Sequence, residues 1–266
     1  MPQFTRAILK AAALLLLGYC AICLLLFVNQ RNMIYFPQPR QFNFADDLVL
    51  PKPDGQIRIS AKALPGSEAL LYFGGNAEDV SLNLTELANQ FPNHAIYLPH
   101  YPGYGHNSIG VGGTSGSPSE AGIFADALQV FDHISQQHTE LLLVGRSLGS
   151  GVASYVASRR KIARLVLITP FDSIERIAAQ RFRFFPISLI LQDKFESWRY
   201  APQITAPTLI IASEIDAIVP RSSTEALIAA VKPKIARAKV LTGVDHGSIS
   251  AHPDYFVEWK NARKHK

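Results

Sequence analysis

The stretch LLLVGRSLGSGVASYVAS (141–158) decides the fold expected for this chain. Four apolar residues are followed at once by GRSLG (145–149), and a helix-compatible run comes next. This is the pattern of a nucleophile elbow, in which a serine stands on a strained turn between a buried strand and a helix. Small residues on either side let the strand and the helix pass closely, which accounts for Gly145 and Gly149. The pattern predicts that Ser147 is a nucleophile.

The sequence around this stretch predicts an α/β domain with a mostly parallel sheet. Short apolar runs without polar alternation are typical of strands that helices cover on both faces. The expected strands are 56–63, 69–73, 94–98, 141–144, 165–168, 208–212 and 239–241. The clearest helical pattern covers 118–137, where Ser117 and Glu120 predict a capping box with Pro118 at the first helical position. Strands that alternate with helices place ligands at the carboxyl ends of the strands.

Two further residues follow Ser147 in the order Ser, Asp, His that an elbow of this kind uses. Asp216 lies just past the strand expected at 208–212, where a carboxylate can accept the N–H of a histidine and hold its ring. Glu214 is the alternative acid. His246 comes after the last expected strand, so we predict that it is the base.

Two other histidines, His100 and His106, come before the last expected strand, so neither is expected to be the base. His100 and His106 flank YPGYG (101–105), in a loop at the carboxyl end of a strand, where they could line a pocket. Asp245, next to the predicted base, is expected to be a loop residue. Surface or capping roles are expected for the remaining histidines, which are His94, His133, His138, His252 and His265.

Two backbone N–H groups are expected to bind the oxyanion of a tetrahedral intermediate. Leu148 opens the helix after Ser147, so its N–H points to the place where the oxyanion forms. FGGN (73–76) follows the strand expected at 69–73, and the N–H of Asn76 is predicted to be the second donor. A plain Gly-Gly turn is the alternative explanation of this segment.

The N-terminal run AAALLLLGYCAICLLLFV (11–28) contains no charge. With the four residues before it, a helix here would be about 27 to 33 Å long, which matches a hydrocarbon core of about 30 Å. We expect a transmembrane helix over about 7–28 and not a cleaved signal peptide, because the run is too long and no small-residue cleavage site follows it. The expected organisation is an anchor (1–30), a connector (31–55) and an α/β domain (56–266) in which 171–200 forms a short lid or covers the sheet.

The charges flanking this helix are nearly balanced, with Arg6 and Lys10 before it and Arg31 and Arg40 after it. A short basic tail usually stays in the cytoplasm. We therefore expect a single-pass membrane protein whose catalytic domain is extracytoplasmic, and periplasmic in a Gram-negative bacterium. The formal net charge of +5 comes from scattered basic residues, whereas a nucleic-acid-binding protein clusters them, so no nucleic-acid partner is expected.

Both cysteines, Cys20 and Cys23, fall in the anchor, so the rest of the chain has no thiol for a disulfide or a cysteine-ligated zinc site. A Ser-His-Asp arrangement needs neither a metal nor an organic cofactor, and we expect none. The expected partners are the membrane and a small-molecule or acylated substrate. The sequence leaves the oligomeric state open.

Taken together, these motifs resemble the α/β-hydrolases, and in particular the branch that contains membrane-associated serine hydrolases and depalmitoylating thioesterases. The resemblance implies the α/β-hydrolase fold, a triad of Ser147, Asp216 and His246, and oxyanion donation by Asn76 and Leu148. The chain departs from its relatives at Gly74, where a histidine is common, and over 171–200. The segments that carry the resemblance are LYFGGNAED (71–79), YPGYG (101–105), GSPSE (116–120), GRSLGSGVA (145–153) and DHGS (245–248).

The activity expected from these features is hydrolysis of an ester or a thioester through an acyl-enzyme. A peptidase or a perhydrolase on the same fold uses the same triad and is one alternative. A catalytically inactive, membrane-tethered binding protein is the other.

Overall fold

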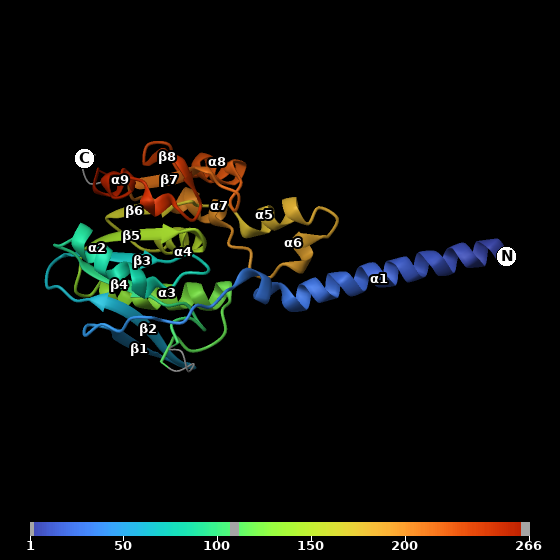
Figure 1. Cartoon of the computed structure of the whole chain (residues 1–266), viewed down its shortest axis with the longest axis horizontal. Helices are drawn as coiled ribbons and strands as arrows, with labels where there is room; N and C mark the ends of the chain where they lie inside the picture. The colour runs from blue at the N-terminus through green and yellow to red at the C-terminus, as the bar shows by residue number, and fades with distance from the viewer. Residues whose placement is uncertain (1–2, 107–111, 262–266) are drawn as a thin grey trace.

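A single mixed sheet organises the chain in the computed structural model, which describes residues 3–106 and 112–261 (Figure 1). Within these residues the strand order is β1-β2-β4-β3-β5-β6-β7-β8. Strand β2 runs antiparallel to both of its neighbours, and the remaining pairs are parallel. The strands are β1 (Leu48–Lys52), β2 (Gly55–Lys62), β3 (Glu68–Phe73), β4 (Ala95–Pro99), β5 (Glu140–Arg146), β6 (Arg164–Ile168), β7 (Thr208–Ile215) and β8 (Ala236–Asp245).

Helices follow most of the parallel strands, as in right-handed βαβ units. They are α1 (Gln3–Ile34), α2 (Leu84–Gln90), α3 (Glu120–Ile134), α4 (Leu148–Ala157), α5 (Ile174–Arg181), α6 (Ile187–Ile190), α7 (Ser197–Tyr200), α8 (Arg221–Ala230) and α9 (Tyr255–Asn261). Three short 3₁₀ helices complete the described part: η1 (Val80–Asn83), η2 (Ala201–Gln203) and η3 (Ile249–Ala251).

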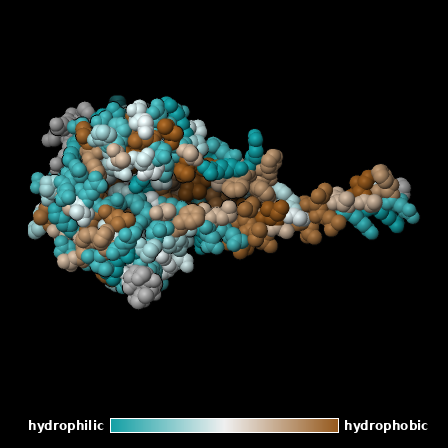
Figure 2. Space-filling model, viewed as in Figure 1, coloured by the Kyte–Doolittle hydropathy of each residue, from teal (hydrophilic) through white to brown (hydrophobic). Residues whose placement is uncertain are grey.

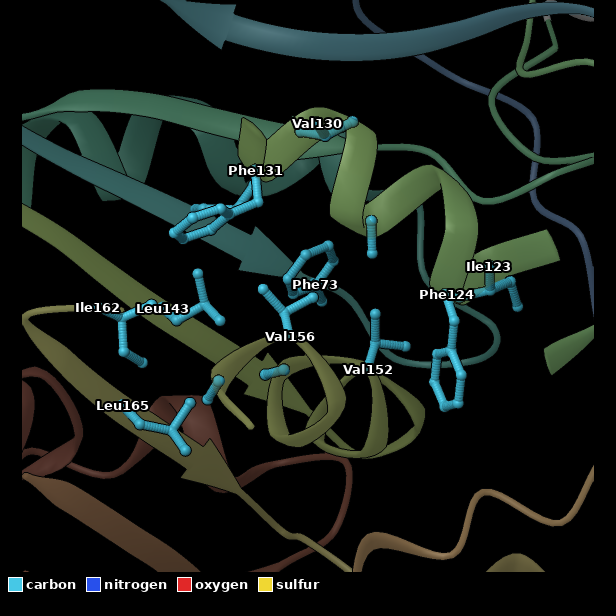
Figure 3. Packing of buried hydrophobic residues seen from close by; sticks show 14 of the residues in the cluster. Phe73, Ile123, Phe124, Val130, Phe131, Leu143, Val152, Val156, Ile162 and Leu165 are labelled. Carbon is cyan, nitrogen blue, oxygen red and sulfur yellow. The ribbon is translucent and has the colours of Figure 1, made fainter. Parts of the chain in front are cut away.

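Both faces of the sheet are buried, which explains why its strands lack polar alternation. Leu141 and Leu143 of β5 pack with side chains of α3 and α4 on one face (Figure 3). Leu142 and Val144 point to the other face, where they share a core with residues of α2 and α9. Because neighbouring side chains of a strand point to opposite faces, one apolar run serves two cores. The predicted α/β-hydrolase architecture is confirmed.

The expected strands all form, with bounds that shift by a few residues, but one strand was not expected. Strand β1 lies inside the predicted connector (31–55) and pairs with β2 through a tight turn. Its Pro51 argues against a central strand, because proline donates no ladder hydrogen bond. The residue is tolerated here because β1 is at the edge of the sheet. Gly55, at φ +138, makes the reversal into β2 possible.

Helix α3 begins later than predicted, and its cap is a different serine. The N-cap is Ser119, and not Ser117: Ser119 is extended and its Oγ accepts the N–H of Gly122 at 3.1 Å. The side chain of Glu120 does not close a capping box either, since it accepts the N–H of Lys194 at 2.7 Å. The competing partner is a distant loop, which a local pattern cannot reveal.

Helix α1 projects away from the domain (Figure 1) and is long and apolar enough to cross a membrane. It extends from Gln3 to Ile34, beyond both ends of the predicted span. Most of its large apolar side chains are exposed, as a lipid-facing helix requires. Its last turns are different, because Gln30 is buried against the domain. Residues 262–266, the end of the expected domain and the site of His265, lie outside the described residues.

Candidate active site

Ser147 stands between β5 and α4 in a backbone conformation that few non-glycine residues adopt, with φ 50° and ψ −116°. A positive φ in a residue with a side chain is strained, and such strain concentrates at functional sites. The turn is held by the N–H of Ser147, which donates to the carbonyl of Ile168 at 2.9 Å. The result is a serine side chain raised above the carboxyl end of the sheet, as the elbow pattern predicts.

The two glycines of the elbow are required by close backbone packing. A Cβ on Gly149 would overlap the carbonyl oxygens of Phe73 and Gly74 at the end of β3. A Cβ on Gly145 would overlap the carbonyl of Gly149 and the side chain of Ala153. The helix can therefore start directly against the neighbouring strand only if both positions carry no side chain.

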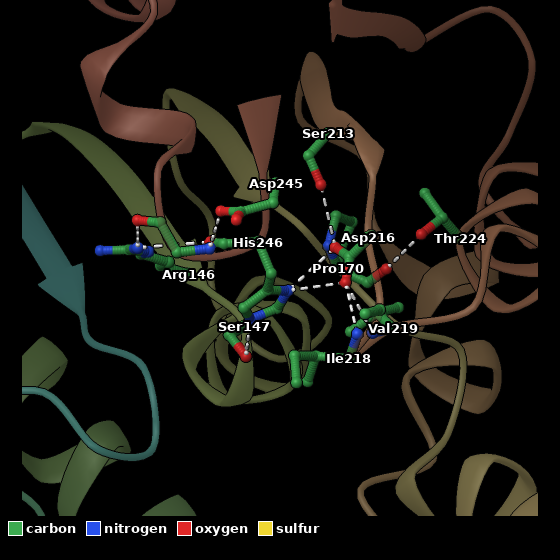
Figure 4. A network of polar contacts seen from close by, with 12 residues as sticks. Arg146, Ser147, Pro170, Ser213, Asp216, Ile218, Val219, Thr224, Asp245 and His246 are labelled. Atoms are coloured by element: carbon green, nitrogen blue, oxygen red, sulfur yellow. Dashed lines mark hydrogen bonds and ion pairs between the residues drawn. The ribbon is translucent and has the colours of Figure 1, made fainter. Parts of the chain in front are cut away.

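Three residues from the ends of β5, β7 and β8 form a continuous chain of hydrogen bonds (Figure 4). Nε2 of His246 lies 2.9 Å from Oγ of Ser147. Nδ1 of the same ring lies 2.9 Å from Oδ2 and 3.1 Å from Oδ1 of Asp216. The carboxylate favours the tautomer with the proton on Nδ1, which leaves Nε2 as an acceptor facing the serine hydroxyl. This is the relation between nucleophile, base and orienting acid that acyl transfer needs.

Asp216 is held by groups other than the histidine as well. Its Oδ1 accepts the N–H groups of Ile218 and Val219 at 2.9 and 2.8 Å, and its Oδ2 accepts the hydroxyl of Ser213 at 3.1 Å. Burial alone would raise the pKa of Asp216, but the hydrogen bonds from His246 and the two backbone N–H groups outweigh it and lower that pKa. The carboxylate is therefore charged and fixed at neutral pH.

The alternative acid, Glu214, points elsewhere. Its carboxylate accepts the N–H of Gly243 at 2.8 Å, at an exposed part of the paired strands β7 and β8. Asp245 organises the loop that carries the histidine, because its Oδ1 accepts the N–H groups of Gly247 and Ser248 at 3.0 and 2.8 Å. Of these three acids, only Asp216 is hydrogen-bonded to the ring of His246 in the described part of the chain.

Arg146 is one of the two variable residues of the elbow motif, and it supports the loop that carries His246. Its guanidinium donates to the carbonyls of Gly247 at 3.0 Å and His246 at 3.4 Å (Figure 4). The motif allows any residue at this position and therefore did not single out Arg146. The only available signal was a long cationic side chain next to the predicted nucleophile.

The N–H groups of Leu148 and Asn76 are free to bind a ligand. Neither donates a hydrogen bond to any of the described residues, and both residues line the cavity above Ser147. The Leu148 N–H also lies at the N-terminus of α4, where the helix dipole favours negative charge. The two donors that the sequence predicted therefore lie beside the predicted nucleophile.

The loop that carries Asn76 is braced by Glu78, which the sequence analysis did not identify. Oε2 of Glu78 accepts the N–H of Gly75 at 2.5 Å, and Oε1 accepts the hydroxyl of Tyr72 at 2.7 Å. On the other side of the loop the hydroxyl of Tyr101 donates to the carbonyl of Gly74 at 2.8 Å. A side chain at Gly74, where relatives commonly have a histidine, would overlap Val80. In this chain the bracing comes from Glu78 and Tyr101 instead.

The end of α1 also contacts this loop. The side chain of Asn76 accepts the N–H of Phe36 at 3.1 Å and the hydroxyl of Tyr104 at 2.9 Å through Oδ1. Its Nδ2 donates to the carbonyl of Ile34. Helix α1 thus ends in direct contact with the residue that carries one predicted oxyanion donor.

A cavity of about 450 Å³ opens above Ser147 and is lined almost entirely by apolar side chains. Its walls come from three places: the last turns of α1, the helices α5 and α6, and the loop that begins at Ile218. The segment 171–200, expected to be a lid or a sheet cover, supplies α5 and α6 to these walls. An apolar cavity of this size next to a serine hydroxyl suits the acyl chain of a substrate.

Four of the other histidines lie where the sequence analysis did not place them. His100 is buried, bonded to Ser60 Oγ at 3.0 Å, and does not line the cavity, and neither does His106. Burial lowers the pKa of His100 to about 4, so its ring is neutral. His94 and His138 are buried instead of exposed: the ring of His94 packs against Phe91, and the ring of His138 is hydrogen-bonded to the Tyr97 hydroxyl at 2.9 Å and to the Gly66 carbonyl at 2.8 Å.

Within residues 3–106 and 112–261, no group of three or more His, Cys, Asp or Glu side chains has the arrangement of a metal site.

Comparisons with known proteins place the chain in a family. No protein-family model matches it. An uncharacterized protein of Mycobacterium tuberculosis is 32% identical over 257 residues, which cover 90% of this chain and 88% of that protein. Protein bem46 of Schizosaccharomyces pombe is 25% identical over 239 residues, or 79% of this chain and 75% of the relative. The lysophosphatidylserine lipase ABHD12 of Macaca fascicularis is 32% identical over 184 residues, but these cover only 59% of this chain and 44% of that lipase.

Solved structures share the architecture at low sequence identity. An esterase of Pyrococcus furiosus matches with a TM-score of 0.66 at 12% identity, over 87% of this chain and 97% of the esterase. A monoacylglycerol lipase of Paleococcus ferrophilus matches with a TM-score of 0.56 at 18% identity, over 78% of this chain and 96% of the lipase. The elbow at Ser147, the order of the strands and the relatives that match most of this chain all lead to the same conclusion. The chain belongs to the α/β-hydrolase family.

Proposed function

We propose that this protein is a membrane-anchored serine hydrolase that cleaves carboxylic esters or thioesters through an acyl-enzyme. The observation that carries the proposal is the unbroken hydrogen-bond chain from Ser147 through His246 to Asp216, at 2.9 Å for each of its two shortest links. A buried carboxylate, a correctly oriented imidazole and a strained serine have no common structural purpose, but acyl transfer requires all three.

In the first half of the reaction, Nε2 of His246 takes the proton of Ser147 as Oγ attacks the substrate carbonyl. The N–H groups of Asn76 and Leu148 donate to the oxyanion as it forms, and Asp216 stabilises the imidazolium. His246 then gives its proton to the departing alkoxide or thiolate. In the second half, a water molecule takes the place of the leaving group, the same proton transfers follow, and the carboxylic acid is released with Ser147 restored.

The apolar cavity favours a substrate with a hydrocarbon acyl chain. Two of the similar proteins are lipases by name, which is consistent with such a chain but does not identify it. We further propose that segment 171–200 is the cover of this cavity, since α5 and α6 form its walls. Ester and thioester substrates both fit this proposal, because the triad attacks the carbonyl carbon of either one.

The test of the nucleophile is Ser147→Ala. This variant should lose hydrolysis of short p-nitrophenyl esters and lose labelling by a fluorophosphonate probe. Ser158→Ala is the matched control, since Ser158 is the C-cap at the far end of α4 and its hydroxyl bonds only locally, to the carbonyl of Tyr155 and the guanidinium of Arg159. Labelling that persists in Ser147→Ala would show that another residue is the nucleophile. A wild-type protein that reacts with no serine-directed probe would instead favour an inactive binding protein.

We also propose that α1 crosses the membrane once and that the catalytic domain is extracytoplasmic. The support is the length and apolar character of α1, with Arg6 and Lys10 near its N-terminus. A reporter enzyme fused after Lys266 should be active only if it is exported. A fusion that is active only in the cytoplasm would reverse this orientation.

A further inference from the structure

The connection between α5 and α6 reaches back along α1 into the part of the helix that is predicted to cross the membrane. The hydroxyl of Tyr19 donates to the carbonyl of Phe184 at 3.0 Å. The rings of Tyr19 and Phe185 stack, with centroids 5.7 Å apart and planes 3° from parallel. Figure 1 shows α5 and α6 on the side of the domain from which α1 projects.

The position of this contact along α1 sets its depth. Tyr19 lies nine residues before Val28, the last residue of the apolar run, which is about 14 Å along a helix. A hydrocarbon core is about 30 Å thick, so the contact lies within about one leaflet of the domain-side surface. If α1 crosses a bilayer through its apolar run, Phe184 and Phe185 must enter that leaflet beside it.

The side chains of this connection suit such a position. Phe184 is 80% exposed and Leu189 is 83% exposed, and neither is covered by any described part of the chain. Figure 2 shows hydrophobic residues along α1 and continuing onto the adjoining side of the domain. Isolated exposed apolar side chains are ordinary, but a cluster that adjoins a membrane-spanning helix marks a lipid contact.

The charges of residues 181–190 are complementary to an anionic membrane surface. The sequence RFRFFPISLI (181–190) contains two arginines and no acid. Arg181 donates to the carbonyl of Ala217 at 3.0 Å, and neither it nor Arg183 forms an ion pair with a described carboxylate. Arginine can extend to the headgroups while its neighbours are immersed, and anionic lipids attract it. Aromatic side chains interleaved with arginines are typical of a segment that lies in the lipid interface.

We propose that residues 181–190 form a second membrane-binding element, which inserts into the leaflet beside α1 and holds the mouth of the cavity against lipid. The cavity is walled by Leu26 and Met33 of α1 and by Ile187 and Ile190 of α6. These are the same two elements that meet the bilayer. An acyl chain can therefore pass from the leaflet to Ser147 along an apolar surface; this last step rests on the proposed hydrolase activity, whereas the insertion rests only on the proposed membrane crossing of α1.

The first experiment measures depth in the full chain, reconstituted into phospholipid nanodiscs that contain anionic lipid. Cys20 and Cys23 are replaced by alanine, and the environment-sensitive dye NBD is attached to Phe184→Cys or to the control Val257→Cys. Val257 is 49% exposed on α9, at the end of the domain away from α1 (Figure 1).

At position 184, doxyl-labelled lipids should quench the dye, and aqueous iodide should quench it about fivefold less than at position 257, since an interfacial segment is shielded from water. Equal quenching by iodide at the two positions, with no quenching by the doxyl lipids, would overturn the insertion. This result does not depend on any enzymatic activity.

The second experiment asks whether insertion serves the substrate. The double variant Phe184→Ser with Leu189→Ser changes two side chains that do not line the cavity. It should hydrolyse a water-soluble short-chain ester at the wild-type rate, but a long-chain acyl ester embedded in vesicles about tenfold more slowly, because the apolar contact with the leaflet is lost.

Equal rates on the vesicle substrate for the variant and the wild type would overturn the role in substrate access, as would an equal loss on both substrates. If wild-type protein hydrolyses neither ester, the proposed function fails, and the quenching experiment still decides the insertion.

Discussion

Replacing Glu78 with glutamine should slow acyl transfer without removing any group that touches the substrate. The carboxylate accepts three hydrogen bonds: from Gly75 N–H at 2.5 Å, from the Tyr72 hydroxyl at 2.7 Å and from the Asn83 amide at 2.5 Å. A glutamine has one acceptor oxygen and one NH₂ donor group. If the oxygen of the glutamine keeps the hydrogen bonds from Tyr72 and Asn83, its NH₂ group faces the N–H of Gly75, and the two donors repel each other. The loop that carries the oxyanion donor must then move.

The size of the effect follows from the bond that is lost. A hydrogen bond to a charged group contributes about 1.5–3 kcal/mol, and each 1.4 kcal/mol is about tenfold in rate. Removal of a whole oxyanion donor costs about 10²–10³-fold in kcat, which is the upper bound here because the Asn76 N–H is displaced and not deleted. We expect kcat to fall about 10–100-fold with KM nearly unchanged, since the interaction is used only in the transition state.

The assay is steady-state hydrolysis of a p-nitrophenyl ester by the full chain in detergent, with active sites counted by fluorophosphonate titration. Glu86→Gln is the matched control, because it removes the same charge from an exposed position of α2. The thermal midpoint of each variant shows whether the fold is intact. A kcat for Glu78→Gln within twofold of the control would refute the bracing role, since the loop would then hold its donor without the carboxylate.

Three further predictions concern single positions. Asp216→Asn should lower kcat by roughly 10³–10⁴-fold, because the amide favours the wrong tautomer of His246. The pKa of Asp216 is lowered in the folded protein, so the stability that its carboxylate provides is present near neutral pH and is lost below about pH 4. Thermal unfolding measured from pH 7 to 3 should therefore show a smaller acid destabilisation in the variant than in the wild type. His100 has a pKa of about 4 when folded and about 6.5 when unfolded, so the wild-type protein should lose stability as the pH falls between these values, and His100→Gln should remove that slope in the same measurement. Gly149→Ala should cost about 1–3 kcal/mol and abolish esterase activity through its overlap with β3, whereas Gly18→Ala, which meets no atom within 4 Å, should change neither the thermal midpoint nor the activity.

The residues that the sequence could predict are those whose positions follow from topology. Ser147, Asp216 and His246 each come directly after a strand of the parallel part of the sheet, and parallel strands end at the same edge. Their order along the chain then leaves few ways to pair them. Asn76 follows from the same argument, because its loop comes directly after β3, the neighbour of β5. The order of strands and loops along the chain was therefore enough to predict that these residues lie close together.

The residues that the sequence missed act through partners that are distant along the chain or unmarked by any motif. Glu78 has no pattern of its own, and it matters only because Gly75 and Tyr72 present donors to it. The cap of α3 moved from Ser117 to Ser119 because Glu120 binds a loop more than seventy residues away. Such choices depend on the geometry of side chains across the fold, which periodicity and turn signals do not contain.

The bounds of α1 illustrate the same limit. Polar residues after Val28 suggested that the helix ends where the hydrocarbon does. The helix continues because those residues find partners in the domain: Gln30 donates to the carbonyl of Ile190 at 3.1 Å and accepts the N–H of Gln192 at 2.6 Å, and Arg31 pairs with Asp193 at 3.1 Å. Polar groups that would have stopped a lipid-facing helix instead fasten it to the protein.

Helix α1 therefore has a structural role in the domain in addition to its predicted role as a membrane anchor. Its 32 residues extend about 48 Å, whereas a bilayer core needs only about 30 Å, and residues 29–34, about 9 Å of helix after the apolar run, lie on the domain side. Among these residues, Gln30 fixes the helix to the segment after α6, and Ile34, with the adjoining Phe36, holds the side chain of Asn76. A slide of α1 by one residue, about 1.5 Å, would break both attachments. If α1 crosses the membrane as proposed, the same few residues set both the depth of the domain at the membrane and the position of the predicted oxyanion donor.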